Sequence, residues 1–195
     1  MQLPFRKEDK KKNTVRDAPG AELDRQLAEG IGKGDRKALA RWLDRHLTPL
    51  YRYLTRRLGP GHEQLVEEVV RLTLEEAIRR MKPYARGKAS LPMHLWLLRL
   101  ANRHLARSKL RARIKATPGG EGVESVGLEH LRKVMITMPP RHQAVVALAL
   151  FERMDPEDVG AAAGISPGRA MRRLRDALKR IDQDDARLED SLEYT

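Results

Sequence analysis

Basic side chains crowd the stretch from residue 169 to residue 180. It holds six basic residues and a single acid, Asp176. The basic residues are Arg169, Arg172, Arg173, Arg175, Lys179 and Arg180. A guanidinium group can donate two parallel hydrogen bonds to a guanine edge or to a phosphate, and a lysine offers a point charge to a phosphate. The chemistry that this spacing favours is therefore recognition of a polyanion.

The residues around this stretch predict a helix, a tight turn and a second helix. Asp155 and Pro156 form a typical helix start, and Gly164 supplies a left-handed residue that ends the helix. Ser166 and Pro167 begin the second helix, which we expect to run to about Ile181. Its apolar stripe consists of Ala170, Leu174, Ala177, Leu178 and Ile181. This is a helix-turn-helix of the kind that places a helix in the DNA major groove, although an ordinary helical hairpin with a solvated basic face is the alternative.

The composition of the whole chain predicts an all-α protein that binds a polyanion. The chain has 195 residues, 41% of them hydrophobic but only 4% aromatic, and a formal net charge of +12. The charge is segregated, because residues 91–115 hold seven Lys or Arg and no acid, whereas residues 182–195 hold six acids and one Arg. No apolar run approaches the roughly 20 residues of a membrane span. We expect no membrane insertion and a cytoplasmic location.

Catalytic and metal-binding patterns are not found in the sequence. There are no cysteines, and the six histidines show no metal-ligand spacing. There is also no nucleophile elbow and no phosphate-cradling glycine loop. We therefore expect no enzyme activity, no cofactor and no metal site.

The first half of the chain predicts a short helix followed by a long one. Residues 1–20 are expected to be a mobile basic arm, and residues 22–29 a first helix that is broken by the glycines at 30–34. Asp35 should cap a helix over 36–58, kinked at an interior proline, Pro49. The apolar stripe of this helix is Leu39, Trp42, Leu43, Leu47, Leu50, Leu54 and Leu58.

Two further helices should complete the first half, over about 62–81 and 92–113. The former is expected to bury Leu65, Val66, Val69, Leu72, Ala77, Ile78 and Met81 and to show an acidic outer face of Glu63, Glu67, Glu68, Glu75 and Glu76. The latter should pack inward through Leu95, Trp96, Leu98, Ala101 and Leu105. It should expose Arg99, Arg103, His104, Arg107, Lys109, Arg111 and Arg113. An all-positive helix with a tryptophan suits contact with the DNA backbone and stacking on unpaired bases, although Trp96 is more typical of a core position.

A glycine-rich segment divides the chain into two small helical domains. We expect a flexible linker at 116–127 between a domain at 21–115 and a helix-turn-helix domain at 128–181. Helices at about 128–137 and 141–152 should support the helix-turn-helix. The acidic tail at 182–195 could fold back on the basic recognition helix.

Taken in order, these segments resemble the sigma-70 family of transcription initiation factors, in its two-domain extracytoplasmic-function group. The similarity spans about Leu23 to Ile181. It rests on Leu43–Tyr53 with its interior proline, Gln64–Val69, Trp96–Ala101, Met138–Val145, and Asp158 through Gly168 with Arg173 and Ala177. Departures from the family pattern include Gln64 in place of Asp, Glu67 in place of Gln, and Val70 in place of an aromatic residue.

The resemblance implies partners and a role for each basic or polar stretch. It implies core RNA polymerase and promoter DNA as partners and leaves an anti-sigma factor open as a third. Contacts to polymerase would come from Gln64, Glu67, Glu68 and Arg71. The −10 element would meet Trp96, Arg99, Arg103, His104, Arg107, Lys109 and Arg111, and the −35 element the six basic residues from Arg169 to Arg180. The alternatives are a stand-alone helix-turn-helix regulator, a divergent sigma paralogue that no longer initiates, and a general basic architectural protein.

Overall fold

Helices build the whole described part of the chain. The computed structural model describes residues 20–88, 91–107 and 126–193, and within these ranges it contains helices and turns but no strand. The all-α prediction is thus confirmed. The expected basic arm before Gly20, and the segment 108–125 with most of the expected linker, lie outside the described residues.

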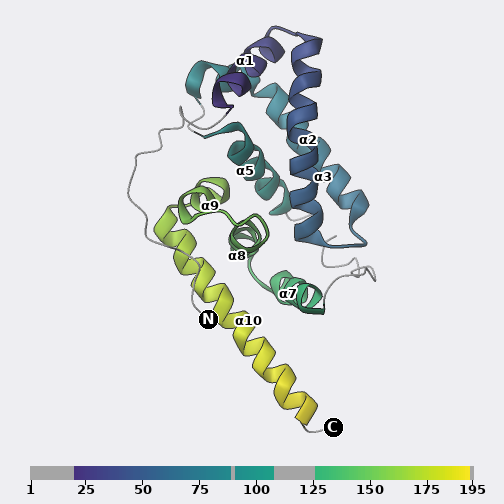
Figure 1. Cartoon of the computed structure of the whole chain (residues 1–195), viewed down its shortest axis with the longest axis vertical. Coiled ribbons are helices and arrows are strands. Elements are labelled where there is room, and N and C mark those ends of the chain that lie inside the picture. The colour runs from purple at the N-terminus through teal and green to yellow at the C-terminus, as the bar shows by residue number, and fades with distance from the viewer. Residues whose placement is uncertain (1–19, 89–90, 108–125, 194–195) are drawn as a thin grey trace.

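Residues 20–107, here called the N-terminal half, form four main helices (Figure 1). These are α1 (Ala21–Gly32), α2 (Arg36–Leu58), α3 (Glu63–Arg79) and α5 (Met93–Leu105), with the short α4 (Met81–Pro83) and the π-helical turn η1 (Tyr84–Lys88) after α3. The bounds of α2 agree with the prediction, and Pro49 lies inside it. The Asp35 carboxylate caps α2, because it accepts hydrogen bonds from the backbone N–H groups of Lys37 (2.8 Å) and Ala38 (3.3 Å).

The helix α1 is longer than the sequence predicts. It continues through Gly30 to Gly32 instead of ending at Glu29. A Cβ on Gly30 would lie 2.6 Å from the Cβ of Ala38, so the glycine allows α1 and α2 to approach closely. Packing of Gly30 against α2 and of Gly32 against Lys82 of α4, and not helix propensity, explains why these glycines are helical.

Some residues at the edges of the apolar stripes differ from the prediction in their burial. Leu47 and Ile78 were expected in the core, but they are 40% and 37% exposed. Glu76 was expected on an acidic outer face, but it is buried beside α5. Helical periodicity gives the direction of a stripe, whereas its width depends on which neighbouring helix covers each edge.

Residues 126–193, here called the C-terminal half, contain two helices joined by a tight turn at the place where the helix-turn-helix was predicted. Its elements are α7 (Val126–Thr137), α8 (Pro140–Val146), the π-helical turn η2 (Ala147–Phe151), α9 (Pro156–Ala163) and α10 (Pro167–Glu193). The helix α10 does not end near Ile181 but continues through the expected acidic tail. A continuous helix cannot fold back on its own first turns, so the expected contact between the tail and the recognition helix is wrong.

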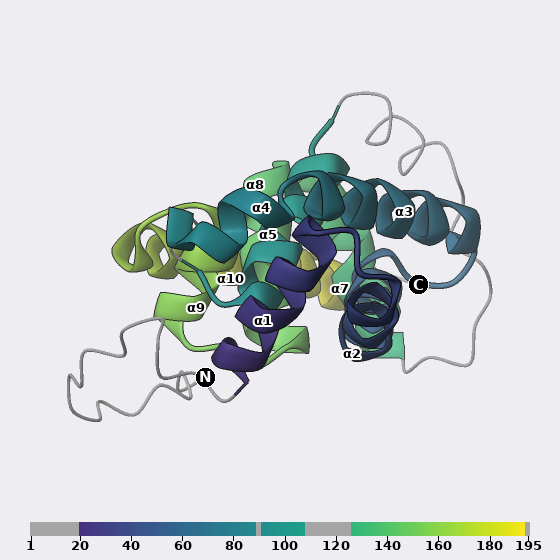
Figure 2. The same ribbon diagram turned by 90° about the horizontal axis from the view of Figure 1, so that it is seen from above.

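The two halves share a hydrophobic core. The helix α5 lies near the middle of the molecule in two perpendicular views and packs against α3 on one side and α9 on the other (Figures 1 and 2). One buried cluster joins Leu54, Val69 and Leu98 of the N-terminal half to Val145 and Ala162 of the C-terminal half. A second cluster, around Trp42 and Met93, belongs to the N-terminal half alone. The division into two domains stays a prediction, but in this structure the halves are in direct contact.

Candidate nucleic-acid interface

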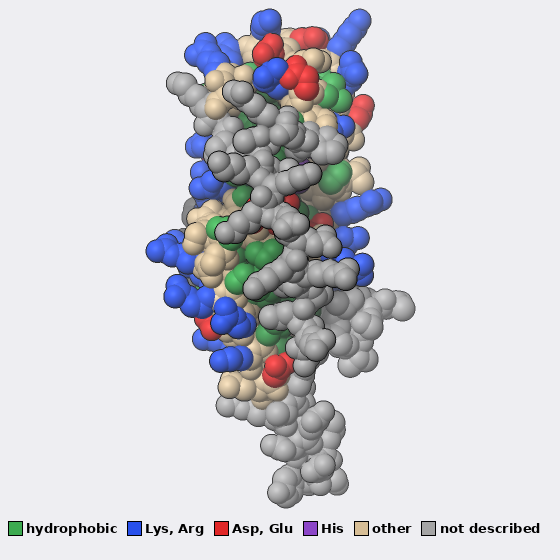
Figure 3. All heavy atoms as spheres, turned by 60° about the vertical axis from the view of Figure 1, so that its left-hand side comes forward, with side chains coloured by type: hydrophobic (Ala, Val, Ile, Leu, Met, Phe, Trp, Pro, Cys, Tyr) green, Lys and Arg blue, Asp and Glu red, His purple; other side chains and the backbone are tan. Residues whose placement is uncertain are grey.

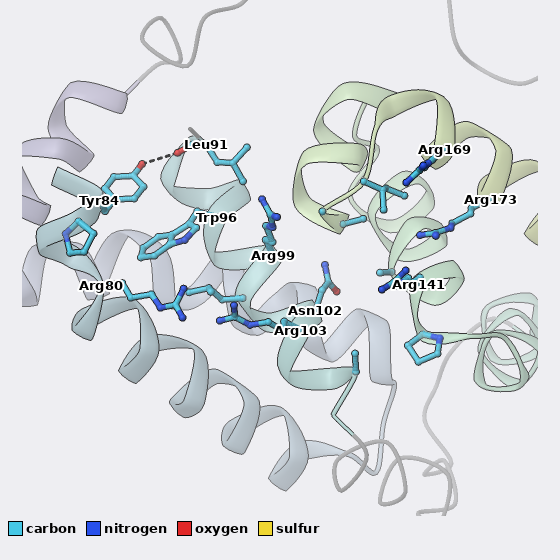
Figure 4. A pocket seen from close by; sticks show the side chains of 18 residues that line it. Arg80, Tyr84, Leu91, Trp96, Arg99, Asn102, Arg103, Arg141, Arg169 and Arg173 are labelled. Atoms are coloured by element: carbon cyan, nitrogen blue, oxygen red, sulfur yellow. Dashed lines mark hydrogen bonds between the residues drawn. The ribbon is translucent and has the colours of Figure 1, made fainter. Parts of the chain in front are cut away.

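A cleft of about 830 Å³ lies between the two halves (Figure 4). Its N-terminal wall comes from α5 and from the segment between α3 and η1. Its C-terminal wall comes from the start of α8, the turn after α9 and the first turns of α10. Among the described residues, six arginines and no Asp or Glu line it: Arg80, Arg99, Arg103, Arg141, Arg169 and Arg173.

The tight turn between α9 and α10 sets the position of the C-terminal wall. Asp155 caps α9 by accepting hydrogen bonds from the N–H groups of Glu157 (2.9 Å) and Asp158 (2.8 Å), as predicted. Gly164 ends the helix in the left-handed conformation (φ 71°, ψ 36°), and the N–H of Ile165 donates to the carbonyl oxygen of Gly160 at 2.8 Å. This closing turn directs the start of α10 toward the cleft.

Gly160 of α9 lies close to the backbone of Ile165 and Pro167, at the start of α10. A Cβ at this position would lie 2.9 Å from the carbonyl oxygen of Ile165 and 3.0 Å from the nitrogen of Pro167. Because both are backbone atoms, they cannot rotate away as a side chain could. The run of small residues in α9 therefore allows the two helices of the motif to meet backbone to backbone.

The N-terminal wall is held by an aromatic pair. The rings of Trp96 and Tyr84 lie 4.9 Å apart between centroids, and the Tyr84 hydroxyl donates a hydrogen bond to the carbonyl oxygen of Leu91 at 3.2 Å. Burial, with a contribution from the charge of Asp24, raises the pKa of Tyr84 to about 12, so this hydroxyl keeps its proton at neutral pH. Trp96 is only 9% exposed, so it packs in the core at the edge of the cleft.

Two of the six arginines are neutralised within the N-terminal half. Arg103 and Arg80 both pair with the buried carboxylate of Glu76, the latter at 2.8 Å. No described carboxylate lies within ion-pair distance of the other four, Arg99, Arg141, Arg169 and Arg173. Burial lowers the pKa of Arg173, and the positive charges of Arg141, Arg169 and Arg172 lower it further. The cleft thus concentrates positive charge that no described carboxylate balances.

The predicted −35 residues divide into two groups. Arg169 and Arg173, one helical turn apart, face the cleft, whereas Arg172, Arg175, Lys179 and Arg180 are exposed outside it. In the view of Figure 3, Lys and Arg side chains lie along the left edge of the described surface and along the upper part of its right edge. The two cleft-facing arginines therefore lie opposite the N-terminal half, with Arg173 half-buried and Arg169 exposed.

The predicted −10 residues are also dispersed. Trp96, Arg99 and Arg103 line the cleft, and Arg107 is exposed beyond the end of α5. His104 was expected outside, but it is 2% exposed, with its Nε2 atom 3.0 Å from Glu76 Oε2. This buried position is a correction, because a side chain that faces Glu76 in the core cannot contact DNA in this arrangement. Lys109 and Arg111 lie outside the described residues.

The predicted polymerase-binding residues share one stripe of α3. Gln64, Glu67 and Arg71 are exposed, and Glu68 is half-buried beside them. Arg71 pairs with Glu75 at 2.7 Å, one turn further along. The exposed Ile78 continues the same stripe by another turn and was missed by the sequence analysis, since its side chain fitted the core pattern.

Sequence reasoning missed several residues of the cleft. Arg80 is in the last turn of the helix predicted over 62–81, Tyr84 follows that helix, and Arg141 follows the Pro139–Pro140 break. Asn102, also on the wall, is buried and accepts a 2.6 Å hydrogen bond from the Tyr53 hydroxyl. The sequence shows that these residues are charged or polar. It does not show that they lie together, because that depends on how the two halves pack.

Two kinds of site are not found in the described ranges. No helix there is long and apolar enough to cross a bilayer. No group of His, Asp or Glu side chains in those ranges gathers in an arrangement that could hold a metal ion.

Comparison with known proteins identifies a solved structure with a similar fold. No protein-family model and no curated protein matches the sequence. Among solved structures, the chain is similar to that reported as the structure of CnrH in complex with the cytosolic domain of CnrY. The TM-score is 0.61 and the identity 20%, over 82% of this chain and 95% of that chain. CnrH is an extracytoplasmic-function sigma factor. The chain therefore shares the helical fold of that structure.

Proposed function

We propose that this chain is a transcription initiation factor that binds core RNA polymerase and directs it to promoters through −10 and −35 contacts. The observation that carries the proposal is a helix-turn-helix with an arginine-rich second helix, joined to a second basic helix in a fold similar to that of CnrH. A lone helix-turn-helix regulator needs no second domain with a separate polar docking stripe. The presence of both parts favours an initiation factor.

The stripe of α3 is the proposed docking surface for polymerase. Gln64, Glu67 and Arg71 are exposed on it, and Ile78 adds an apolar contact at its end. Polar rims with a few apolar anchors are typical of specific protein interfaces. This stripe lies apart from the cleft, since none of its residues lines the cleft. Polymerase and DNA contacts can thus be altered separately.

The arginines of the cleft and of α10 are the proposed DNA contacts. Arg169, Arg172 and Arg173 lie in the first turns of the recognition helix, where base edges are usually read, whereas Lys179 and Arg180 are placed for phosphates. On the N-terminal half, Arg99 and Arg103 would contact the −10 strand, and Arg107, Lys109 and Arg111 extend the same basic segment.

The present arrangement of the halves is closed with respect to DNA. A recognition helix fills a major groove about 12 Å wide, which needs its reading face clear of other helices. Here Arg169 and Arg173 face α5 across the cleft, and the Arg99 side chain lies against Gly164. The proposed function therefore requires the halves to separate when the protein binds polymerase and DNA.

A protein partner of the anti-sigma kind is part of the proposal. CnrH was solved with the cytosolic domain of CnrY, which is an anti-sigma factor. The similarity of fold supports the same kind of partner for this chain. The halves around the cleft would be the surfaces that such a partner could hold together.

The test is a titration of the labelled chain with purified core RNA polymerase. Charge reversal in Glu67→Arg should weaken binding by about tenfold, since one acid at an interface centre can contribute about 1.4 kcal/mol. Glu29→Arg, on the exposed surface of α1, is the matched control and should bind like the unaltered chain. Unchanged affinity in Glu67→Arg would remove the α3 stripe from the interface. If the chain binds duplex DNA tightly but no polymerase, it is a stand-alone regulator.

A further inference from the structure

The cleft between the halves holds more positive charge than its surroundings balance. Arg99 comes from α5 on one wall, whereas Arg141, Arg169 and Arg173 come from α8 and α10 on the other. These four have no described carboxylate within ion-pair distance, and the described lining of the cleft contains no acid. Figure 4 shows Arg99 extending from one wall while the other three lie on the facing wall. Like charges on facing walls oppose closure, so the shared apolar core must hold the halves together against this repulsion.

The C-terminal wall should bind an anion more strongly than the N-terminal wall, because part of its positive charge is buried. The Nη1 atom of Arg173 is buried and has no hydrogen-bond partner among the described residues. A buried guanidinium nitrogen without a partner costs free energy that a bound anion would recover. Arg169 lies one turn before Arg173 on the same helix face, so one ligand can reach both.

We propose that this cleft binds a small oligophosphate, whose phosphate groups bridge Arg99 on one wall to Arg141, Arg169 and Arg173 on the other. The volume of about 830 Å³ suits a ligand of nucleotide size. Each phosphate offers acceptor oxygens that match the forked donors of a guanidinium group, and a chain of phosphates supplies several charges over a short length. By bridging the walls, the ligand would stabilise the closed arrangement.

Larger anions fit the cleft less well. Duplex DNA does not fit into a cleft of about 830 Å³, since its major groove alone is about 12 Å wide. The acidic residues after Asp182 are not a suitable occupant either, because α10 carries them away from the cleft as one continuous helix (Figure 1). A short, highly charged anion therefore suits the size and the positive charge of this cleft best.

The binding site itself does not depend on the proposed function, but its consequence for transcription rests on it. If the cleft arginines read promoter DNA, a bound oligophosphate would compete for them and also hold the halves closed. It would then lower DNA binding without touching the α3 stripe. Loss of DNA binding with polymerase affinity retained is the distinguishing result.

The test measures binding of inorganic tripolyphosphate to the full chain by calorimetry, at constant ionic strength and without DNA or polymerase. We expect one saturable site, and an affinity about tenfold weaker in Arg99→Gln and in Arg173→Gln. Arg52→Gln is the matched control, because it removes the same charge from an exposed position outside the cleft, and its affinity should change by less than about twofold. Helix content by circular dichroism confirms that each variant is folded.

Three outcomes would overturn the proposal. Binding without saturation, or an equal loss in Arg52→Gln, would mean that net charge alone attracts the anion. Tighter binding of a glutamate-rich peptide than of tripolyphosphate would assign the cleft to an acidic protein segment. A parallel titration with ATP distinguishes an inorganic oligophosphate from a nucleotide, since both carry a chain of phosphates. Equal affinity indicates that phosphates alone are read, and higher affinity for ATP indicates a nucleotide. Because polymerase is absent, failure here leaves the proposed function standing.

Discussion

Arg132 of α7 caps the C-terminal end of α2. Its Nε atom donates a 3.0 Å hydrogen bond to the carbonyl oxygen of Arg56, in the last turn of that helix. The Arg132 side chain also runs over Gly59, where a Cβ would lie 3.0 Å from its Cδ atom. A cation at a helix C-terminus is favoured by the helix dipole and satisfies a carbonyl group that has no partner within the helix. This contact, with the Arg56–Glu152 ion pair (3.4 Å) beside it, ties the two halves together.

Removing the Arg132 guanidinium should loosen the contact between the halves. Arg132→Met keeps the apolar stem but leaves the Arg56 carbonyl without its charged donor. We expect the free energy of unfolding to fall by about 1.5 kcal/mol, as for a hydrogen bond to a charged group. Chemical denaturation followed by circular dichroism measures the change, with Arg52→Met on the exposed face of α2 as the control. Equal stability of the two variants would show that the contact contributes nothing.

A methyl group at Gly160 should disrupt the helix-turn-helix. In Gly160→Ala the new Cβ would be 2.9 Å from the carbonyl oxygen of Ile165, so the start of α10 must shift. We expect a loss of about 2 kcal/mol in stability, as in other overpacked sites. Gly168→Ala, where no atom lies within 4 Å of the new Cβ, should instead be neutral or stabilising by up to about 0.5 kcal/mol. Thermal unfolding compares them, and a tolerated Gly160→Ala would contradict the close approach of α9 and α10.

The buried Glu76 should make the chain sensitive to acid. Burial alone would raise the pKa of Glu76, but Arg103, Arg80 and His104 together bring it below its usual 4.5. Burial lowers the pKa of His104 below its usual 6.5, with the charge of Arg107 acting in the same direction. Both groups therefore bind fewer protons in the folded chain than in the unfolded chain. Stability should decrease as the pH falls below 6.5 through His104, and further below 4.5 through Glu76.

The substitution Glu76→Gln separates these two contributions. It should cost about 2 kcal/mol at neutral pH, because Arg103 and Arg80 lose their shared carboxylate. It should also abolish the part of the acid sensitivity that begins below 4.5. Glu75→Gln, at a partly exposed neighbouring position, is the control and should change stability by less than about 0.5 kcal/mol. Urea denaturation at several pH values provides the data, and identical pH profiles for all three chains would refute the assignment.

Two basic residues of α10 should behave differently on DNA. Arg169→Ala should reduce discrimination at one base pair of the −35 element by about 1–3 kcal/mol, because a bidentate contact to a base edge is lost. Lys179→Ala should instead weaken binding evenly across sequences and reduce its salt dependence. Affinities for a panel of single-base variants of the promoter duplex distinguish these effects. Parallel behaviour of both variants would show that Arg169 reads no base.

Local signals in the sequence predicted much of this fold. The caps at Asp35 and Asp155 and the left-handed Gly164 were predicted because each depends on a few neighbouring residues. The apolar stripe of α10 was also predicted, and the structure agrees, because Ala170, Leu174 and Ala177 are all buried. The full length of α10 was missed, although the sequence contains no Gly or Pro after Gly168 that would end it.

The features that depend on tertiary packing could not be predicted in the same way. The burial of His104 and Glu76 follows from the pairing of α3 with α5, which no periodicity specifies. The cleft depends on α5 meeting α9 across a segment of 18 residues, 108–125, that lies outside the described structure. Arg99 and Arg173 are far apart in sequence, so only the packed halves show that they line one cavity.

An initiation role can be measured by mapping transcription start sites with purified components. Core RNA polymerase would be supplied with the chain and with fragments of genomic DNA, and the 5′ ends of the transcripts would be determined. We expect start sites that appear only when the chain is present, that are used less with Glu67→Arg, and that become less sequence-specific with Arg169→Ala. Polymerase that binds the chain but starts nowhere new would contradict an initiation role and indicate a paralogue that only occupies the enzyme.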